Sequence, residues 1–133
     1  MLQYAGDSGE NMTIADFAIV IVIAIHFLFA FKEFSGRNKT TFYQKFNIEL
    51  AEKQEPAQIG RIVANAAIFN VLLGVGLIVS LYVPREQGLL LKGYLLVSII
   101  IAGIVGGVTL KPSVAVLQSA PAAVALILVL LAK

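Results

Sequence analysis

The stretch that decides the fold is residues 13–34, TIADFAIVIVIAIHFLFAFKEF. Between Asp16 and Lys32 it holds fifteen residues, of which only His26 is polar. A helix rises about 1.5 Å per residue, so roughly 20 apolar residues cross the roughly 30 Å of hydrocarbon in a bilayer, where an unpaired backbone amide finds no water. This stretch is therefore predicted to be a membrane-spanning helix.

The composition of the whole chain agrees with a membrane location. Of its 133 residues, 59% are hydrophobic and 14% are charged, and the mean hydropathy is +0.88. A typical soluble domain is about half apolar and a quarter charged, so the surplus apolar surface must face lipid. We expect an integral protein of the cell (inner) membrane. The chain has no cysteine, which excludes disulfides, thiolate metal sites, iron–sulfur clusters and cysteine nucleophiles.

Three more apolar segments follow the first and bring the number of predicted spans to four. They cover residues 59–83, 89–110 and 113–132. Because the last two links are only a few residues long, consecutive helices must be antiparallel neighbours. The sequence therefore predicts an all-α membrane protein, a four-transmembrane-helix antiparallel bundle that forms a single domain over residues 13–133.

A proline inside the fourth span is expected to bend it. Pro121 lacks a backbone N–H, and its ring clashes with the carbonyl of Leu117. We expect a kinked fourth helix near Leu117, with the Gln118 side chain available to the backbone groups that the kink frees.

Small residues in the third span indicate close helix packing. Ala102 and Gly106, and likewise Gly103 and Gly107, form two overlapping pairs four positions apart, a spacing that lets another backbone approach closely. One bundle of this size encloses little volume, so a further hypothesis is a homo-oligomer formed through the Gly103/Gly107 face.

The connection between the first two spans, residues 35–58, is too charged to cross a membrane. Phe42, Phe46 and Leu50 recur about one turn apart, the pattern of a short amphipathic helix in the headgroup region, and a solvated loop explains the segment equally well. Pro56 suits the first turn of the next helix, where its missing N–H costs nothing.

The distribution of Lys and Arg predicts the orientation in the membrane. Cations are retained on the cytoplasmic side, so the side with more of them is predicted to be cytoplasmic. We therefore predict a cytoplasmic loop at 35–58, both termini outside, and residues 1–12 as an extracytoplasmic arm. The same asymmetry accounts for a pI near 9.0 without a nucleic-acid partner. The seven cations of the loop side are Lys32, Arg37, Lys39, Lys45, Lys53, Arg61 and Lys111, and the three of the other side are Arg85, Lys92 and Lys133.

His26 is the strongest single functional candidate. An ionisable group in lipid costs about 2.5 kcal/mol or more, so such residues usually face the bundle interior and serve function. An imidazole can carry a proton, bind a solute or ligate a metal, and the alternative is a structural histidine hydrogen-bonded to another helix. No second histidine accompanies it, so no metal site is predicted.

Glu33 lies seven positions after His26 and projects from the same helix face. Two interpretations are open. Glu33 forms a boundary salt bridge with Lys32 or Arg37, or it pairs with Arg61 of the second span and closes the cytoplasmic end of a polar cavity.

Three amides complete the intramembrane polar set. Each is worth about 0.6 to 2 kcal/mol as a hydrogen bond between helices, and for any one of them this role is favoured over ligand binding. Asn65 shares a helix face with Arg61, whereas Asn65 and Asn70 point about 140° apart. Taken together, the polar groups of the first, second and fourth spans predict an internal polar face. The candidate residues of this cavity or ligand site are His26, Glu33, Arg61, Asn65, Asn70 and Gln118.

Three short pieces of the chain are similar to those of a known family. They are His26 followed by Glu33-Phe34, the run Asn65-Ala-Ala-Ile-Phe-Asn70, and Ile101-Ala-Gly-Ile-Val-Gly106 with Leu117-Gln118-Ser-Ala-Pro121. From Ile14 onward the chain resembles the small four-helix bacterial membrane proteins called domain of unknown function 1304. In that family a histidine and a glutamate occur in the first helix, Asn-Gln-Gly-aromatic-Asn in the second and Gln-Gly-x-Pro in the fourth.

The chain departs from the family pattern at several positions. Ala66 stands where the family has glutamine, and Ser119 stands where it has glycine. The residue before the histidine, Ile25, is not acidic, which is a further departure from the family pattern. The extra outer arm of about twelve residues is a further difference. The resemblance implies the architecture and no activity. It favours His26, Glu33, Asn65, Asn70, Gln118 and Pro121 as the positions of a site.

Three functions compete for this architecture. The leading hypothesis is a membrane protein whose internal polar face binds or translocates a small solute or a proton. The second is a non-catalytic accessory subunit packed against a larger membrane complex. The third is a small membrane enzyme, supported only by Arg61 and Asn65 on one helix face. No GxSxG, P-loop, GxGxxG or HExxH motif occurs, so catalytic residues are not predicted and no cofactor is indicated.

Overall fold

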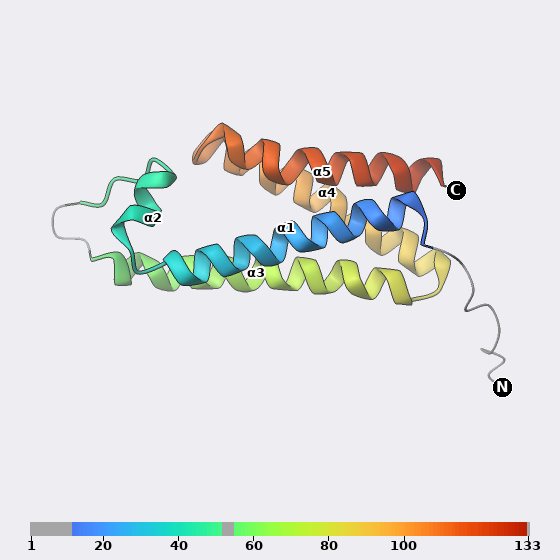
Figure 1. The fold of residues 1–133 in the computed structure, drawn as a ribbon, viewed down its shortest axis with the longest axis horizontal. Coiled ribbons are helices and arrows are strands. Elements are labelled where there is room, and N and C mark those ends of the chain that lie inside the picture. The colour runs from blue at the N-terminus through green and yellow to red at the C-terminus, as the bar shows by residue number, and fades with distance from the viewer. Residues whose placement is uncertain (1–11, 52–54, 133) are drawn as a thin grey trace.

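The computed structural model describes residues 12–51 and 55–132, so the predicted arm at 1–12 lies almost wholly outside the described residues. Four long helices form an elongated bundle, and a short helix lies at one end of it (Figure 1). Each long helix is long and apolar enough to cross a membrane. The helices are α1 (Ile14–Gly36), α2 (Thr40–Lys45), α3 (Pro56–Tyr82), α4 (Arg85–Thr109) and α5 (Pro112–Leu131). The prediction of an all-helical protein with four spans is confirmed.

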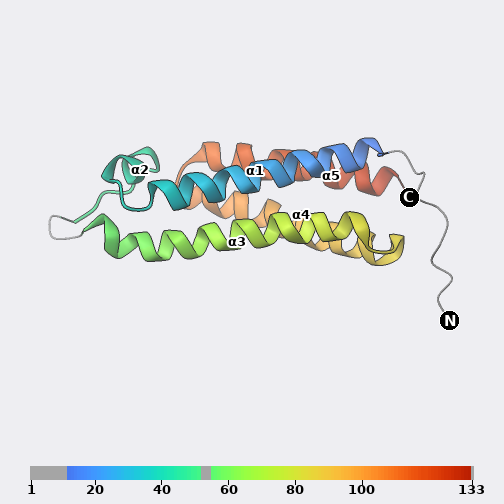
Figure 2. The same ribbon diagram turned by 60° about the horizontal axis from the view of Figure 1, so that its bottom comes forward.

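The long helices form a closed ring. The closest pairs are α1 with α3, α3 with α4, α4 with α5, and α5 with α1, so α1 and α4 face each other across the bundle (Figures 1 and 2). Consecutive long helices run in opposite directions. The first helix therefore begins, and the last one ends, at the same end of the bundle. We call this the pocket end, and the opposite end, where α2 lies, the α2 end.

The core is a narrow apolar column between the helices. Ile19, Leu77, Leu96, Ile99 and Ala122, which come from all four long helices, are fully buried. The outward faces are equally apolar, and large side chains such as Phe17 and Phe31 of α1 are mostly exposed. A helix that is hydrophobic on every side suits a bilayer, because its outer face meets lipid instead of water.

The predicted close approach at the glycines of α4 occurs inside the chain. A Cβ on Gly107 would lie 2.5 Å from the Cβ of Ala115, and one on Gly103 would collide with the Ser119 hydroxyl of α5. The Ser119 hydroxyl instead donates to the Ile100 carbonyl of α4 at 2.8 Å. Since α5 occupies the Gly103/Gly107 face, that face is not open to a second copy, and the hypothesis of an oligomer formed through it is wrong. Ala102, by contrast, points outward.

Helix α5 continues through Pro121 to Leu131 without a break in its assignment. The kink near Leu117 stays a prediction. Gln118 is half-buried, and its predicted hydrogen bond to backbone groups freed by the kink also stays a prediction.

The polar connection forms a short helix, and its predicted position in the headgroup region stays a prediction. α2 covers Thr40–Lys45, and its ring cluster joins Phe42 to Phe46 with centroids 5.0 Å apart, whereas Leu50 lies beyond the helix. Tyr43 is fully buried, and its hydroxyl donates to the carbonyl of Arg37 and, at 3.4 Å, to that of Pro56. Pro56 is the first residue of α3, as predicted.

Candidate functional site

A polar pocket opens at the pocket end of the bundle, where α1 and α4 begin and α3 and α5 end. Its volume is about 510 Å³. All four long helices contribute to its wall, and Ala15, Leu89 and Val129 give it an apolar part. We call it the end pocket. Its polar side chains are those of Thr13, Asp16, Ser80, Arg85 and Lys92, with the backbone of Ala132 beside them.

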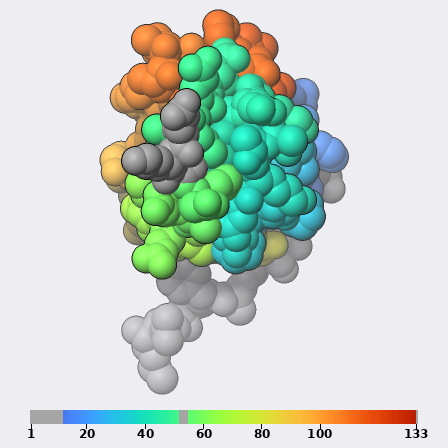
Figure 3. Space-filling view, turned by 90° about the vertical axis from the view of Figure 1, so that its left-hand side faces the viewer, coloured from blue at the N-terminus to red at the C-terminus, as the bar shows by residue number. Residues whose placement is uncertain are grey.

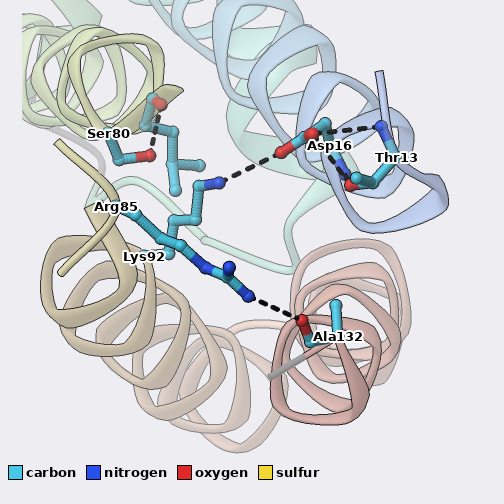
Figure 4. Close-up of polar contacts among 7 residues, drawn as sticks. Thr13, Asp16, Ser80, Arg85, Lys92 and Ala132 are labelled. Atoms are coloured by element: carbon cyan, nitrogen blue, oxygen red, sulfur yellow. Dashed lines mark hydrogen bonds and ion pairs between the residues drawn. The ribbon is translucent and has the colours of Figure 1, made fainter. Parts of the chain in front are cut away.

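An ion pair crosses the end pocket from one side of the bundle to the other. The Lys92 ammonium of α4 lies 3.0 Å from the Asp16 carboxylate of α1 (Figure 4). The two side chains are only 16% and 22% exposed, respectively. A pair with so little solvent is screened less than a surface salt bridge. It joins two helices that are not direct neighbours in the ring.

The start of α1 holds Asp16 in place through a capping box. The Thr13 hydroxyl accepts from the Asp16 backbone N–H at 3.1 Å, and the Asp16 carboxylate accepts from the Thr13 N–H at 3.1 Å and from its hydroxyl at 2.8 Å. These bonds satisfy backbone donors that the first turn of a helix leaves unpaired. The same carboxylate therefore caps α1 and binds Lys92.

Arg85 forms the second polar contact of the end pocket. It follows Pro84 at the start of α4, and its guanidinium donates to the Ala132 carbonyl at 3.3 Å (Figure 4). A guanidinium has five N–H donors, so one carbonyl leaves most of them available. Ser80 of α3 also lines the end pocket. It is buried, and its hydroxyl donates to the Leu77 carbonyl at 2.6 Å.

The charges of the end pocket favour an anionic group. Asp16 balances Lys92, and among the residues that the structure describes the partner of the Arg85 cation is a neutral carbonyl. Planar guanidinium groups bind carboxylates and phosphates through two parallel hydrogen bonds. Within the described ranges, no group of three or more His, Cys, Asp or Glu side chains is placed to hold a metal ion.

His26 lies deeper, at the centre of the bundle, and is fully buried. Its Nδ1 donates to the Val22 carbonyl of its own helix at 2.9 Å, and Nε2 has no partner among the residues that the structure describes. The hydrogen bond to another helix that a structural histidine was expected to make is not present. No hydrogen bond joins His26 to Gln118 in this part of the chain either.

Glu33 pairs with Asn70. The Asn70 amide donates to the Glu33 carboxylate at 2.8 Å and joins α1 to α3. Asp16–Lys92 is the one salt bridge within residues 12–51 and 55–132, so both ion pairs proposed for Glu33 are wrong. Glu33 and Asn70 lie at the same depth on the neighbouring helices α1 and α3, and their contact involves a single charged group.

Arg61 and Asn65 lie apart from the Glu33–Asn70 contact. Both are exposed on the outside of α3. They precede Asn70 along the helix and lie on its α2 side, where a Cβ on Gly60 would be 2.8 Å from the Arg37 carbonyl of the polar connection. Arg61 and Asn65 therefore lie beyond Glu33, closer to the α2 end of the bundle. The structure thus brings together two of the six predicted cavity residues, Glu33 and Asn70.

The residues of the end pocket were not among the sequence candidates. Asp16, Arg85 and Lys92 stand at the ends of apolar runs, and such charges look like ordinary boundary markers. The positions of two charges within the spans could have identified this pair. Asp16 follows the start of the first span by about one turn, and Lys92 does the same in the third. Spans one and three run in the same direction, so these two charges lie at the same depth.

The comparisons with known proteins give a family and no characterised relative. No curated protein and no solved structure matches the chain. The family model described as "Protein of unknown function (DUF1304)" matches residues 20–130. That range includes His26, the Glu33–Asn70 pair and Lys92, whereas Thr13 and Asp16 precede it. Four apolar helices and a match over most of the sequence lead to one conclusion: this chain belongs to the DUF1304 family.

Proposed function

We propose that this protein binds a small solute bearing a carboxylate or phosphate group in the end pocket. The observation that carries the proposal is the pocket itself, about 510 Å³ in volume, with Arg85 and the Asp16–Lys92 pair in its wall. Pockets for small ligands have volumes of about 300 to 1,000 Å³ and combine apolar walls with a few placed polar groups. The end pocket has both features.

Each polar group has a separate task in this proposal. The free donors of the Arg85 guanidinium bind the anionic group of the solute. Asp16 holds the Lys92 ammonium at a fixed place, from which its remaining N–H donors reach the solute. The Asp16 carboxylate also offers an acceptor for an N–H or O–H of the same molecule, which favours a zwitterionic or hydroxylated anion.

The packing below the end pocket supports binding in preference to open conduction. Ile19, Val22 and Leu96 are at most 1% exposed and separate the pocket from His26. A polar solute has no hydrogen-bonding partner along this column, so passage requires the helices to separate. Binding from the aqueous side requires no such change. Translocation of the solute or of a proton through His26 would be a second step after binding.

The proposal is tested by the thermal stability of the purified protein in lipid nanodiscs with a panel of small carboxylates, phosphates, zwitterions and uncharged analogues. A ligand that binds the native state alone stabilises it by RT ln(1 + [L]/Kd), about 2.7 kcal/mol at a hundred times Kd. We expect at least one anion to raise the melting temperature and its uncharged analogue to leave it unchanged.

Two variants locate the response. Arg85→Gln removes the cation of the end pocket and should abolish the shift, whereas Arg61→Gln removes an exposed arginine at the α2 end and should preserve it. A response that survives Arg85→Gln, or a panel without any response, contradicts the proposal.

A further inference from the structure

The α2 end carries a strong excess of positive charge. Six cations lie there among the described residues, against the carboxylates of Glu33, Glu49 and Glu55. None of the six has a carboxylate partner within salt-bridge distance in the described part of the chain. Figure 3 shows this end, with α2 and the polar connection spread over it. The six are Lys32, Arg37, Lys39, Lys45, Arg61 and Lys111.

Lys111 contacts the backbone of Lys45 although the two residues are far apart in the sequence. The Lys111 ammonium, in the turn between α4 and α5, donates to the backbone carbonyl of Lys45 at the end of α2, at 3.1 Å. This bond holds the Lys111 ammonium against the backbone of Lys45, so two cationic residues lie beside each other here. Like charges repel when no anion lies between them. The contact therefore creates a place where an anion is favoured.

The basic residues of the α2 end lie where the long apolar helices stop and the polar connection begins. The Arg37 guanidinium lies over the ring of Phe34, 3.8 Å from its centroid, and Phe42 packs against Phe46. Buried Tyr43 fixes α2 to the bundle through its two carbonyl acceptors. The basic surface is thus held at the level where the spans leave the hydrocarbon.

Exposed apolar side chains lie next to Lys111 in the sequence. Val108 and Leu110, which precede Lys111, are 83% and 39% exposed, and Val116 of α5 is 64% exposed. An acyl chain attached to an anion at Lys111 would lie against these residues. A soluble anion would contact only the cations, whereas a lipid would contact both the cations and this apolar surface.

We propose that the α2 end binds the phosphate headgroup of an anionic phospholipid between Lys45 and Lys111. The two ammonium groups bind the phosphate, and the acyl chains lie along α4 and α5. Helix α2 is then an anchoring element that fixes the depth and tilt of the bundle. The predicted topology places this end at the cytoplasmic leaflet, whose lipids are the anionic ones. This site is independent of the end pocket, which lies at the opposite end of the molecule.

The experiment measures the apparent Kd for the first bound lipid by native mass spectrometry of the purified protein, with phosphatidylglycerol and with phosphatidylcholine. A cation near an anionic lipid contributes about 1 kcal/mol, which corresponds to about a fivefold change in affinity. We expect phosphatidylglycerol to bind more tightly than phosphatidylcholine. Lys45→Gln and Lys111→Gln should each weaken the binding of phosphatidylglycerol about fivefold and leave that of phosphatidylcholine unchanged.

Arg61→Gln, which removes one exposed cation of the α2 end outside the Lys45/Lys111 site, is the matched control and should change the preference for phosphatidylglycerol less than either lysine variant. Circular dichroism verifies that each variant keeps its helices. Equal affinity for the two lipids overturns the inference, as does an equal loss of preference in Arg61→Gln. Inorganic phosphate that competes phosphatidylglycerol off at millimolar concentration would identify a site for free anions and also overturn it.

Discussion

The Asp16–Lys92 pair makes the sharpest energetic prediction, because it joins two helices that otherwise make little contact. The coupling energy between the two side chains is measured by a double-mutant cycle with Asp16→Asn and Lys92→Met. Exposed ion pairs contribute about 0.2 to 1 kcal/mol, and breaking a fully buried one costs about 3 to 5 kcal/mol. With side chains 16% and 22% exposed, the pair lies between these limits. We expect a coupling energy of about 1 to 2 kcal/mol.

The capping box separates the two roles of the carboxylate. Thr13→Ala removes the hydroxyl that bonds the Asp16 backbone and carboxylate, which should cost about 1 kcal/mol without affecting Lys92. Asp16→Ala removes the carboxylate half of the capping box together with the ion pair and should cost about 2 to 3 kcal/mol. Glu86→Gln is the matched control, because Glu86 is an exposed carboxylate in the first turn of α4. It should change stability by no more than about 0.5 kcal/mol.

The assay is reversible unfolding by sodium dodecyl sulfate in mixed micelles, followed by far-ultraviolet circular dichroism. The cycle compares the wild type, the two single variants and the double variant. A coupling energy below about 0.3 kcal/mol, which is the scatter expected of independent sites, refutes the reasoning. It would mean that Lys92 extends into the headgroups and leaves Asp16 to the capping box alone.

Three other residues give predictions that the same unfolding assay measures. Gly103→Leu should destabilise the bundle by more than about 2 kcal/mol, because α5 lies against this glycine, while Ala102→Leu on the outer face should stay within about 0.5 kcal/mol; equal effects would contradict the packing. Asn70→Ala should cost about 1 to 3 kcal/mol, since it leaves a half-buried carboxylate without its donor; no measurable cost would mean that water replaces the amide. Burial raises the pKa of the Tyr43 hydroxyl above its ordinary value of 10.0, so the folded state favours the neutral phenol. Its stabilisation is complete below about pH 10 and is lost as the pH rises through the raised pKa, and Tyr43→Phe should abolish this alkaline loss.

The number and position of the helices follow from local properties of the sequence. Apolar length defines the four spans, and charged or proline-containing links end them. The start of α3 at Pro56 and the close packing at Gly103 and Gly107 were also predicted, because each depends on residue types within a few positions. The sequence left two explanations of the polar connection open, and burial of Tyr43, which neither considered, accounts for its short helix.

Helix rotation was not predictable, and this explains most errors about the site. A soluble helix shows its inner face by alternation of apolar and polar residues, whereas spans such as α1 are apolar on both the inner and the outer face. Asn65 and Asn70 were known to point in different directions, but nothing in the sequence determines which of the two faces inward. The structure buries Asn70 and exposes Asn65. Arg61 shares the face of Asn65 and is exposed with it, so its proposed bond to Glu33 could not form.

Helix register decides the remaining contacts, and it explains why the strongest polar features lie at the two ends of the bundle. The Glu33–Asn70 bond depends on how α3 slides along α1, which a long connection leaves unrestrained in the sequence. Once α1 and α3 are aligned by this bond, His26 has only core side chains around it and bonds within its own helix. The apolar column then excludes water from the centre, and charges are stable only where the column stops. One end holds a balanced pair with a spare arginine, which suits a small anionic solute. The other holds lysines without described carboxylate partners beside exposed apolar residues, which suits a lipid, so the two proposals follow from a single distribution of charge.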